Sequence, residues 1–295
     1  MTHERVLVTG GAGLIAGHCI LQLLEQGYRV RTTVRSLTRE SEVHAVLAEA
    51  GMVDGDNLSF VAADLTDDAG WSDAVDGCDY VLHVASPVRF GKTKNEDEII
   101  SPARDGALRV LRAARDAGVR RVVLTSAFHA VGFGHGHLDH VFTEDDWSPL
   151  HGPGVDAYGR SKILMPGYPN VWVPIVDVRD VAAAHMLAMT SPAAAGERFL
   201  LASGPVVAMK EIGATLREHF GDAAPKVPTR RIPNIVIRLA AHFNDEARSA
   251  AADLDYVKKI SNDKARRVLG WEPRPASEAV IAAAESLIAK SHSTS

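Results

Sequence analysis

Cysteine is nearly absent from this chain, since only Cys19 and Cys78 occur in 295 residues. Both lie in apolar surroundings without the spacing of a metal or redox motif, so we expect buried, reduced thiols. Long apolar runs are also missing, because no stretch approaches the roughly 18 apolar residues that a membrane-spanning helix requires. The N-terminal segment Met1–Gly11 has one short apolar run and no small-residue cleavage site after it. It predicts a first strand and a cytoplasmic protein that does not span a membrane.

An excess of basic charge is missing as well. The formal net charge is -5, and the Lys and Arg residues are scattered rather than bunched against aromatic residues. Nucleic acid is therefore not an expected partner. With 46% hydrophobic and 23% charged residues, the composition is typical of a globular protein with a large core, in one large domain or two unequal ones.

Strand-length apolar runs alternate with helix-length amphipathic stretches through the first half of the chain. This alternation is typical of a parallel sheet with helices on both faces. The predicted strands are Arg5–Val8, Arg29–Val34, Leu58–Ala62, Tyr80–Val84 and Arg121–Leu124. The predicted helices are Leu14–Gln26, Arg39–Ala50, Asp68–Val75 and Asp97–Ala117. The fold class that follows is α/β, with a Rossmann-type doubly wound parallel sheet.

The second half of the chain loses this rhythm. Its predicted strands are Val171–Val178 and Arg198–Leu201. Its predicted helices are Arg179–Met189, Met209–Phe220, Ile235–Phe243, Lys264–Leu269 and Ser277–Lys290. We predict a dinucleotide-binding Rossmann domain over residues 1–165, to which residues 171–190 return, and a smaller α-rich substrate domain over residues 191–295.

A glycine fingerprint, Thr9–Gly17, lies between the first predicted strand and its helix. Gly10 and Gly13 keep the spacing of a dinucleotide-binding motif, and Ala16 takes the third position. In this strand–turn–helix context, glycines let the backbone approach a pyrophosphate, and the helix N-terminus offers N–H groups and a positive dipole end. A tight turn without a ligand is the alternative.

The end of the second strand decides which dinucleotide fits. An acid there binds the ribose 2′-hydroxyl, whereas an arginine neutralises a 2′-phosphate. The segment Arg31–Ser36 contains no acid. Arg35, helped by Arg39, is therefore the candidate partner of a 2′-phosphate, and the predicted cofactor is NADP(H). The alternative for Arg35 is a solvated surface charge. Asp64, after the third strand, can accept a hydrogen bond from an adenine amino group or cap the next helix. Small residues in His83–Pro87 suit close packing against a cofactor.

A phenol and an ammonium group stand four residues apart at Tyr158 and Lys162. On a helix both side chains project from one face. The lysine charge stabilises the phenolate and lowers the tyrosine pKa, which makes the hydroxyl a competent proton donor to a carbonyl that receives a hydride. The pair therefore predicts carbonyl reduction.

Together these motifs resemble the extended short-chain dehydrogenases/reductases of the NAD-dependent epimerase/dehydratase family, within them the dihydroflavonol-reductase-like aldehyde and ketone reductases. The matching segments are Thr9–Gly17, Val34–Arg35, Asp64–Leu65, Leu82–Pro87, Val123–Ser126, Tyr158–Lys162, Val176–Val181 and Lys264–Pro273. The resemblance implies that Tyr158 is the general acid, that Lys162 holds the nicotinamide ribose, and that a serine after the fifth strand orients the substrate carbonyl. It also implies a monomer or homodimer. The candidate cofactor-binding residues are Thr9, Gly10, Gly13, Leu14, Ile15, Arg35, Asp64, Leu65, Ala85, Ser86, Thr125, Tyr158 and Lys162.

The sequence departs from its relatives at two places. Similar proteins end the fifth strand in Thr-Ser-Ser, whereas here Ala127 follows Ser126 and has no hydroxyl. Ser126 is therefore the candidate catalytic serine, although neighbours on an extended strand point to opposite faces. Pro166 then ends the helix begun at Tyr158, which leaves too few residues for the usual helix, strand and substrate loop. We expect part of the segment after the Tyr-x-x-x-Lys motif to be lacking, and the activity to be weakened.

The predicted function is NADPH-dependent reduction of a small or medium apolar aldehyde or ketone to an alcohol. One alternative is an NDP-sugar epimerase or dehydratase, and another is a catalytically impaired dinucleotide-binding protein. A histidine cluster also lies in a glycine-rich loop beside Asp139; its members are His129, His135, His137 and His140. We interpret this cluster as part of a loop near the substrate and expect no functional metal.

Overall fold

The computed structural model describes residues 4–49, 57–87, 97–149, 169–221, 227–228, 230–242 and 251–293. The chain divides into two compact units. The first comprises residues 1–126 and 181–197, and the second comprises residues 127–180 and 198–295. Among the described residues, no helix combines the length and the apolar composition that crossing a bilayer demands.

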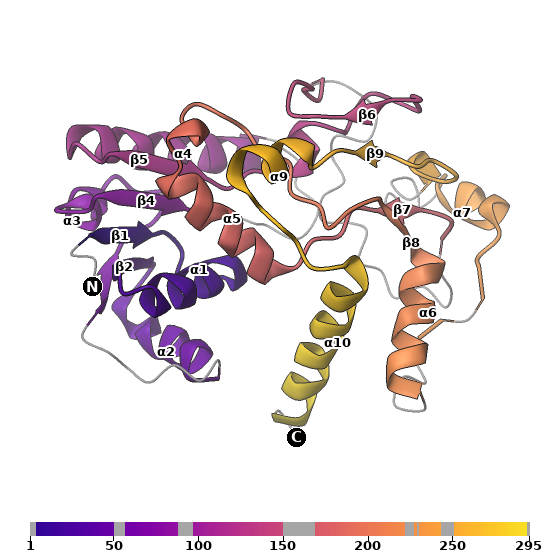
Figure 1. The fold of residues 1–295 in the computed structure, drawn as a ribbon, viewed down its shortest axis with the longest axis horizontal. Coiled ribbons are helices and arrows are strands. Elements are labelled where there is room, and N and C mark those ends of the chain that lie inside the picture. The colour runs from indigo at the N-terminus through magenta and orange to yellow at the C-terminus, as the bar shows by residue number, and fades with distance from the viewer. Residues whose placement is uncertain are drawn as a thin grey trace. The chain divides into compact units, whose positions relative to one another are not determined.

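The first unit is built on a parallel five-stranded sheet (Figure 1). Its strands are β1 (Arg5–Val8), β2 (Arg29–Val34), β3 (Leu58–Ala62), β4 (Tyr80–His83) and β5 (Arg121–Leu124). They lie in the order β3-β2-β1-β4-β5, and every neighbouring pair is parallel. The strand order reverses between β1 and β4, and the carboxyl ends of the strands at such a switch point form the usual ligand crevice of an open α/β sheet. The predicted Rossmann-type sheet is confirmed.

Helices cover both faces of this sheet. They are α1 (Leu14–Glu25), a 3₁₀ turn η1 (Leu37–Arg39), α2 (Glu40–Glu49), α3 (Trp71–Val75), α4 (Asp97–Asp116) and α5 (Val178–Thr190), which begins in the second unit. Along β1, Val6 and Val8 face an apolar cluster shared with α1, α2 and α5, whereas Leu7 faces a second cluster shared with α3 and α4. This alternation follows from the two-residue period of a strand. It gives the doubly wound arrangement, with α1, α2 and α5 packed on one face of the sheet and α3 and α4 on the other.

The second unit contains helices and short strand pairs. Its elements are η2 (Phe128–Ala130), β6 (Val141–Phe142), β7 (Trp172–Val173), β8 (Val207–Ala208), α6 (Met209–Phe220), α7 (Asn234–Ala240), β9 (Lys259–Ile260), α9 (Asp263–Leu269) and α10 (Ala276–Ser293). A further turn, η3 (Pro192–Ala194), belongs to the first unit. Strand β6 pairs with β9 in parallel, and β7 pairs with β8 in antiparallel fashion.

Two predicted strands of the second half were wrong. The expected strand Val171–Val178 is reduced to β7, and Val178 already begins α5. The expected strand Arg198–Leu201 does not form, because the backbone N–H of Leu200 donates to the buried carboxylate of Glu144 at 2.8 Å rather than to a neighbouring strand.

The predicted domain boundary also differs from the observed units. Residues 127–149 belong to the second unit, whereas the predicted dinucleotide-binding domain covers residues 1–165. The physical reason is a small apolar cluster in which Val131 and Phe142 pack with Leu200, and Ile260 packs against them. Residues 181–197 lie in the first unit. The region in which we expected a missing segment includes residues 150–168, which lie outside the described residues.

Candidate functional site

The predicted site residues that the structure describes lie at one edge of the five-stranded sheet. They follow the carboxyl ends of β1, β2, β3, β4 and β5, which in a parallel sheet all lie at the same edge. These residues are Thr9, Gly10, Gly13, Leu14, Ile15, Arg35, Asp64, Leu65, Ala85, Ser86, Thr125 and Ser126. Tyr158 and Lys162 lie outside the described residues.

The glycine loop after β1 is anchored on the neighbouring strand β2. The backbone N–H of Gly10 donates to Thr33 Oγ1 at 2.8 Å, and that of Gly11 donates to the Thr33 carbonyl at 2.9 Å. Gly10 has a φ of +75°, and a Cβ atom there would lie 3.0 Å from the Cβ of Ala85. Glycine at this position therefore meets both a conformational and a steric requirement.

Helix α1 begins directly after this loop, at Leu14. Among the described residues, no side chain caps its N-terminus, and its first turn carries no acid. The first N–H groups of a helix have no intrahelical acceptor, and they lie at the positive end of its dipole. Leu14 is exposed and Ile15 is half-buried. This uncapped N-terminus beside Gly13, which has no Cβ, can accept an anion such as a pyrophosphate.

A buried threonine–histidine pair ties β1 to the end of β4. Thr9 Oγ1 accepts hydrogen bonds from the N–H groups of Val84, at 3.1 Å, and Ala85, at 3.0 Å. Its own proton therefore goes to His83 Nδ1, 2.8 Å away. Burial lowers the pKa of His83 to about 4, so its ring is neutral at pH 7. His83 was not predicted as a site residue, although it is a polar side chain at the end of an otherwise apolar strand.

Arg35 and Asp64 follow the neighbouring strands β2 and β3. Arg35 is exposed and makes no hydrogen bond or ion pair with any described residue, whereas Arg39 pairs with Glu42 at 2.7 Å. Asp64 Oδ1 accepts from the N–H and the hydroxyl of Thr66, at 2.8 and 2.7 Å. These hydrogen bonds lower the pKa of Asp64, and the charge of Arg35 lowers it further. Asp64 therefore shapes a turn, while Arg35 remains available to an anion.

The remaining edge residues differ in exposure. Leu65 packs against the apolar cluster shared with α3 and α4. Ala85 is half-buried and Ser86 is exposed. Ser126 is exposed too, and its hydroxyl makes no hydrogen bond with the rest of the described chain. Thr125 instead hydrogen-bonds to the buried ring of His185, with 2.7 Å between Oγ1 and Nε2.

The histidine cluster after β5 makes other contacts. His135 Nε2 lies 2.9 Å from the Val131 carbonyl, and His137 Nε2 lies 2.8 Å from the Ala252 carbonyl. His140 pairs with Asp146 at 2.9 Å. Within the described ranges, no three His, Cys, Asp or Glu side chains converge as metal ligands.

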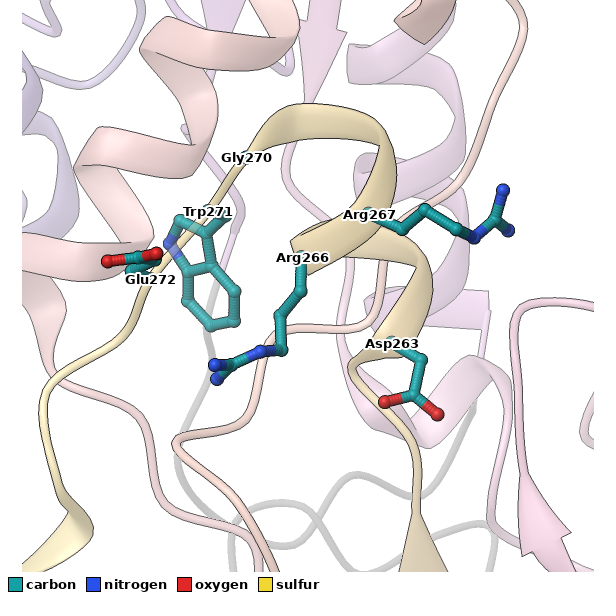
Figure 2. Close-up of a pocket in the computed structure, with 6 residues that line it drawn as sticks. All are labelled: Asp263, Arg266, Arg267, Gly270, Trp271 and Glu272. Atoms are coloured by element: carbon teal, nitrogen blue, oxygen red, sulfur yellow. The ribbon is translucent and has the colours of Figure 1, made fainter.

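A pocket in the second unit lies at the C-terminal end of α9 (Figure 2). Its lining residues are Asp263, Arg266, Arg267, Gly270, Trp271 and Glu272. The indole of Trp271 is buried, and its N–H donates to the Asp180 carbonyl at 2.8 Å. Figure 2 shows the side chains of Arg266 and Arg267 leaving the helix in different directions. They do not converge on one point, so the stronger candidate site is the edge of the sheet.

Comparison with known proteins gives a consistent result. The model of the family described as NAD dependent epimerase/dehydratase matches residues 6–168. Cinnamoyl-CoA reductase 1 of Arabidopsis thaliana is 33% identical over 249 residues, which cover 68% of this chain and 70% of the relative. Yeast methylglyoxal/isovaleraldehyde reductase Gre2, complexed with NADPH, has a similar structure, with a TM-score of 0.75 at 20% identity over 98% of this chain and 99% of Gre2. A UDP-glucose-4-epimerase from Stenotrophomonas maltophila with bound NAD has a TM-score of 0.71 at 20% identity, covering 99% of this chain and 100% of the epimerase.

Proposed function

Since this chain belongs to the NAD dependent epimerase/dehydratase family, we propose that it is an NADPH-dependent reductase of small or medium apolar aldehydes and ketones. The observation that carries the proposal is the carboxyl edge of the sheet. There an uncapped helix N-terminus beside Gly13 can receive a pyrophosphate. Arg35, which pairs with none of the described residues, follows β2, the strand after which a dinucleotide fold recognises the adenine ribose, and it can bind a 2′-phosphate there. The residues present therefore fit NADPH better than NADH.

Bound NADPH supplies a hydride to the carbonyl carbon of the substrate. The residues of this chain supply the rest. Tyr158 donates the proton to the carbonyl oxygen, and Lys162 lowers the tyrosine pKa and holds the nicotinamide ribose. The exposed hydroxyl of Ser126 orients the carbonyl from the end of β5. One hydride and one proton convert the carbonyl to an alcohol and leave NADP⁺.

The reductase names among the relatives support carbonyl reduction. Cinnamoyl-CoA reductase and methylglyoxal/isovaleraldehyde reductase are named for acyl and carbonyl substrates, and the latter was solved with NADPH. The smaller substrate domain predicted over residues 191–295 would hold the substrate. We place the active protein in the cytoplasm, as a monomer or homodimer.

The test is a panel of aliphatic and aromatic aldehydes and ketones, with the full chain and NADPH, followed by loss of absorbance at 340 nm. Tyr158→Phe removes the proton donor, so turnover should fall to background while NADPH still binds. Turnover that survives in this variant would place the chemistry elsewhere. NADPH binding without turnover of any carbonyl by the unmutated chain would instead identify a non-catalytic dinucleotide-binding protein, for which the absent hydroxyl at Ala127 is the favouring observation.

A further inference from the structure

We propose that His185 is a positioning residue that orients Ser126 through Thr125, so that it acts on the reduction step without touching substrate or cofactor. The proposal rests on the reductase function proposed above. It assigns a role to a buried histidine that the proton transfer does not use.

The end of β5 has little backbone support of its own. In the described sheet, β5 lies at the edge and has only β4 as a neighbour. The last hydrogen bond of this pairing runs from the Thr125 N–H to the His83 carbonyl at 3.0 Å. Beyond it, the Ser126 hydroxyl has no partner among the described residues. A side-chain anchor at Thr125 is therefore what can fix the direction of the next residue.

His185 supplies this anchor from α5. Its Nδ1 lies 2.7 Å from the Val181 carbonyl, which can only accept, so Nδ1 carries the proton. Burial lowers the pKa of His185 and keeps the ring neutral, which leaves Nε2 as an acceptor. The Thr125 hydroxyl must then donate to Nε2, at 2.7 Å. The hydrogen bond has one direction and holds the threonine side chain in one orientation.

Helix α5 is a rigid support for this anchor. Ala182, Met186 and Met189 pack into the core shared with α1 and α2, which places their helix face against the sheet. At the other end of β5, Arg121 Nη1 donates to the α5 carbonyl of Ala188 at 3.0 Å. The strand is thus tied to α5 at both ends.

The alternation of side chains along the strand links the orientation of Thr125 to that of Ser126. Val123 packs against the core on the α5 side and Val122 against the core on the α4 side. Thr125 continues the α5 side through its bond to His185. The alternation then directs Ser126 to the opposite face. Without the anchor, the Ser126 hydroxyl loses its fixed direction, while the glycine loop, which would bind the cofactor, keeps its hydrogen bonds to Thr33.

Kinetics of paired Thr125 variants test the proposal. Thr125→Val has the same shape without the hydroxyl, and Thr125→Ser keeps it. Since a misplacement of about 1 Å can cost about 100-fold in rate, we expect kcat to fall roughly 10- to 100-fold in Thr125→Val and by less than about threefold in Thr125→Ser. Thr125 was a candidate cofactor contact from the sequence, but its hydroxyl is bonded to His185 in the structure. The Kd for NADPH should therefore stay within about twofold in both variants. The control is Thr190→Val, which removes an exposed hydroxyl bonded to the Met186 carbonyl on the same helix and should leave kcat unchanged.

Nuclear magnetic resonance separates failure of this proposal from failure of the proposed function. His185→Leu should shift the backbone amide signal of Ser126, and His185→Gln, which keeps an acceptor near the Nε2 position, should restore it. This readout does not depend on turnover. If the unmutated chain reduces no carbonyl, the proposed reductase function is wrong. The amide signals of Ser126 then still test whether His185 positions Ser126. Unchanged kcat in Thr125→Val, or an unmoved Ser126 signal in His185→Leu, overturns the proposal.

Discussion

The Thr9 hydroxyl should contribute several times more to the free energy of unfolding than the Thr32 hydroxyl. Both side chains are fully buried; Thr9 directly follows β1, and Thr32 lies on the neighbouring strand β2. Thr9→Val removes three hydrogen bonds, two accepted from Val84 and Ala85 and one donated to His83. Thr32→Val removes a single bond, donated to the Val8 carbonyl at 2.8 Å. With a net contribution of about 1 kcal/mol per bond, the free energy of unfolding should fall by roughly 3 kcal/mol for Thr9→Val and roughly 1 kcal/mol for Thr32→Val.

The substitution Thr9→Val should also weaken cofactor binding. Gly10 packs against Ala85 so closely that an added Cβ would lie 3.0 Å from the alanine Cβ. Release of Ala85 therefore loosens the glycine loop, and we expect the Kd for NADPH to rise roughly tenfold, equivalent to about 1.4 kcal/mol. Urea denaturation measures the stability difference, and quenching of tryptophan fluorescence measures the Kd. Equal losses of stability in Thr9→Val and Thr32→Val, or an unchanged Kd in Thr9→Val, would refute the reasoning.

Three further outcomes follow from the site. His83 binds a proton near pH 6.5 when unfolded and near pH 4 when folded, so the unfolded state binds more protons between these values and stability falls as pH drops through this window. His83 contributes a loss of about 3 kcal/mol by pH 4, measured as denaturation midpoints against pH, and His83→Asn should remove this contribution. Burial lowers the pKa of His129 to about 4 as well, so part of the pH dependence should remain; a pH dependence identical in His83→Asn and the unmutated chain would contradict the assignment. Arg35→Ala should weaken NADPH binding about 10- to 100-fold and leave NADH binding unchanged, with Arg39→Ala as a control of smaller effect; equal Kd values for both cofactors in the unmutated chain would count against Arg35. Ala127→Ser should raise kcat without changing the Kd for NADPH, because one positioned hydrogen-bond donor can raise the rate by up to about 100- to 1,000-fold. An unchanged kcat would show that Ser126 already donates this hydrogen bond to the substrate carbonyl.

The sheet was predictable from sequence because its central strands, β1 and β4, are buried on both faces. Such strands appear as short continuous apolar runs, and four of the five were predicted to the residue, with β4 ending one residue earlier, at His83. The second unit was harder. Its strand pairs contain two residues each, for example Trp172–Val173, and a pair of residues carries no periodicity. The wrong strand at Arg198–Leu201 has its backbone satisfied by Glu144, more than 50 residues earlier in the chain.

The candidate site was predictable where local motifs carry it. The glycine loop and Arg35 follow strand ends, and parallel topology alone brings strand ends to one edge. The two threonine–histidine pairs could not be predicted in this way. His83 and Thr9 are 74 positions apart, and His185 and Thr125 are 60 positions apart. Only the folded sheet shows that these hydroxyls are already engaged.

The central claim is that this protein catalyses reduction of a carbonyl by NADPH. Transfer of deuterium from the cofactor to the product tests this claim most directly. The full chain is incubated with an aldehyde that it turns over and with NADPH deuterated at C4 of the nicotinamide, in each of the two stereoisomers separately. Proton NMR of the alcohol then shows where the deuterium lies. We predict deuterium on the carbinol carbon from one stereoisomer only, and no labelled alcohol from Tyr158→Phe. Alcohol formed without deuterium from either stereoisomer would contradict the account.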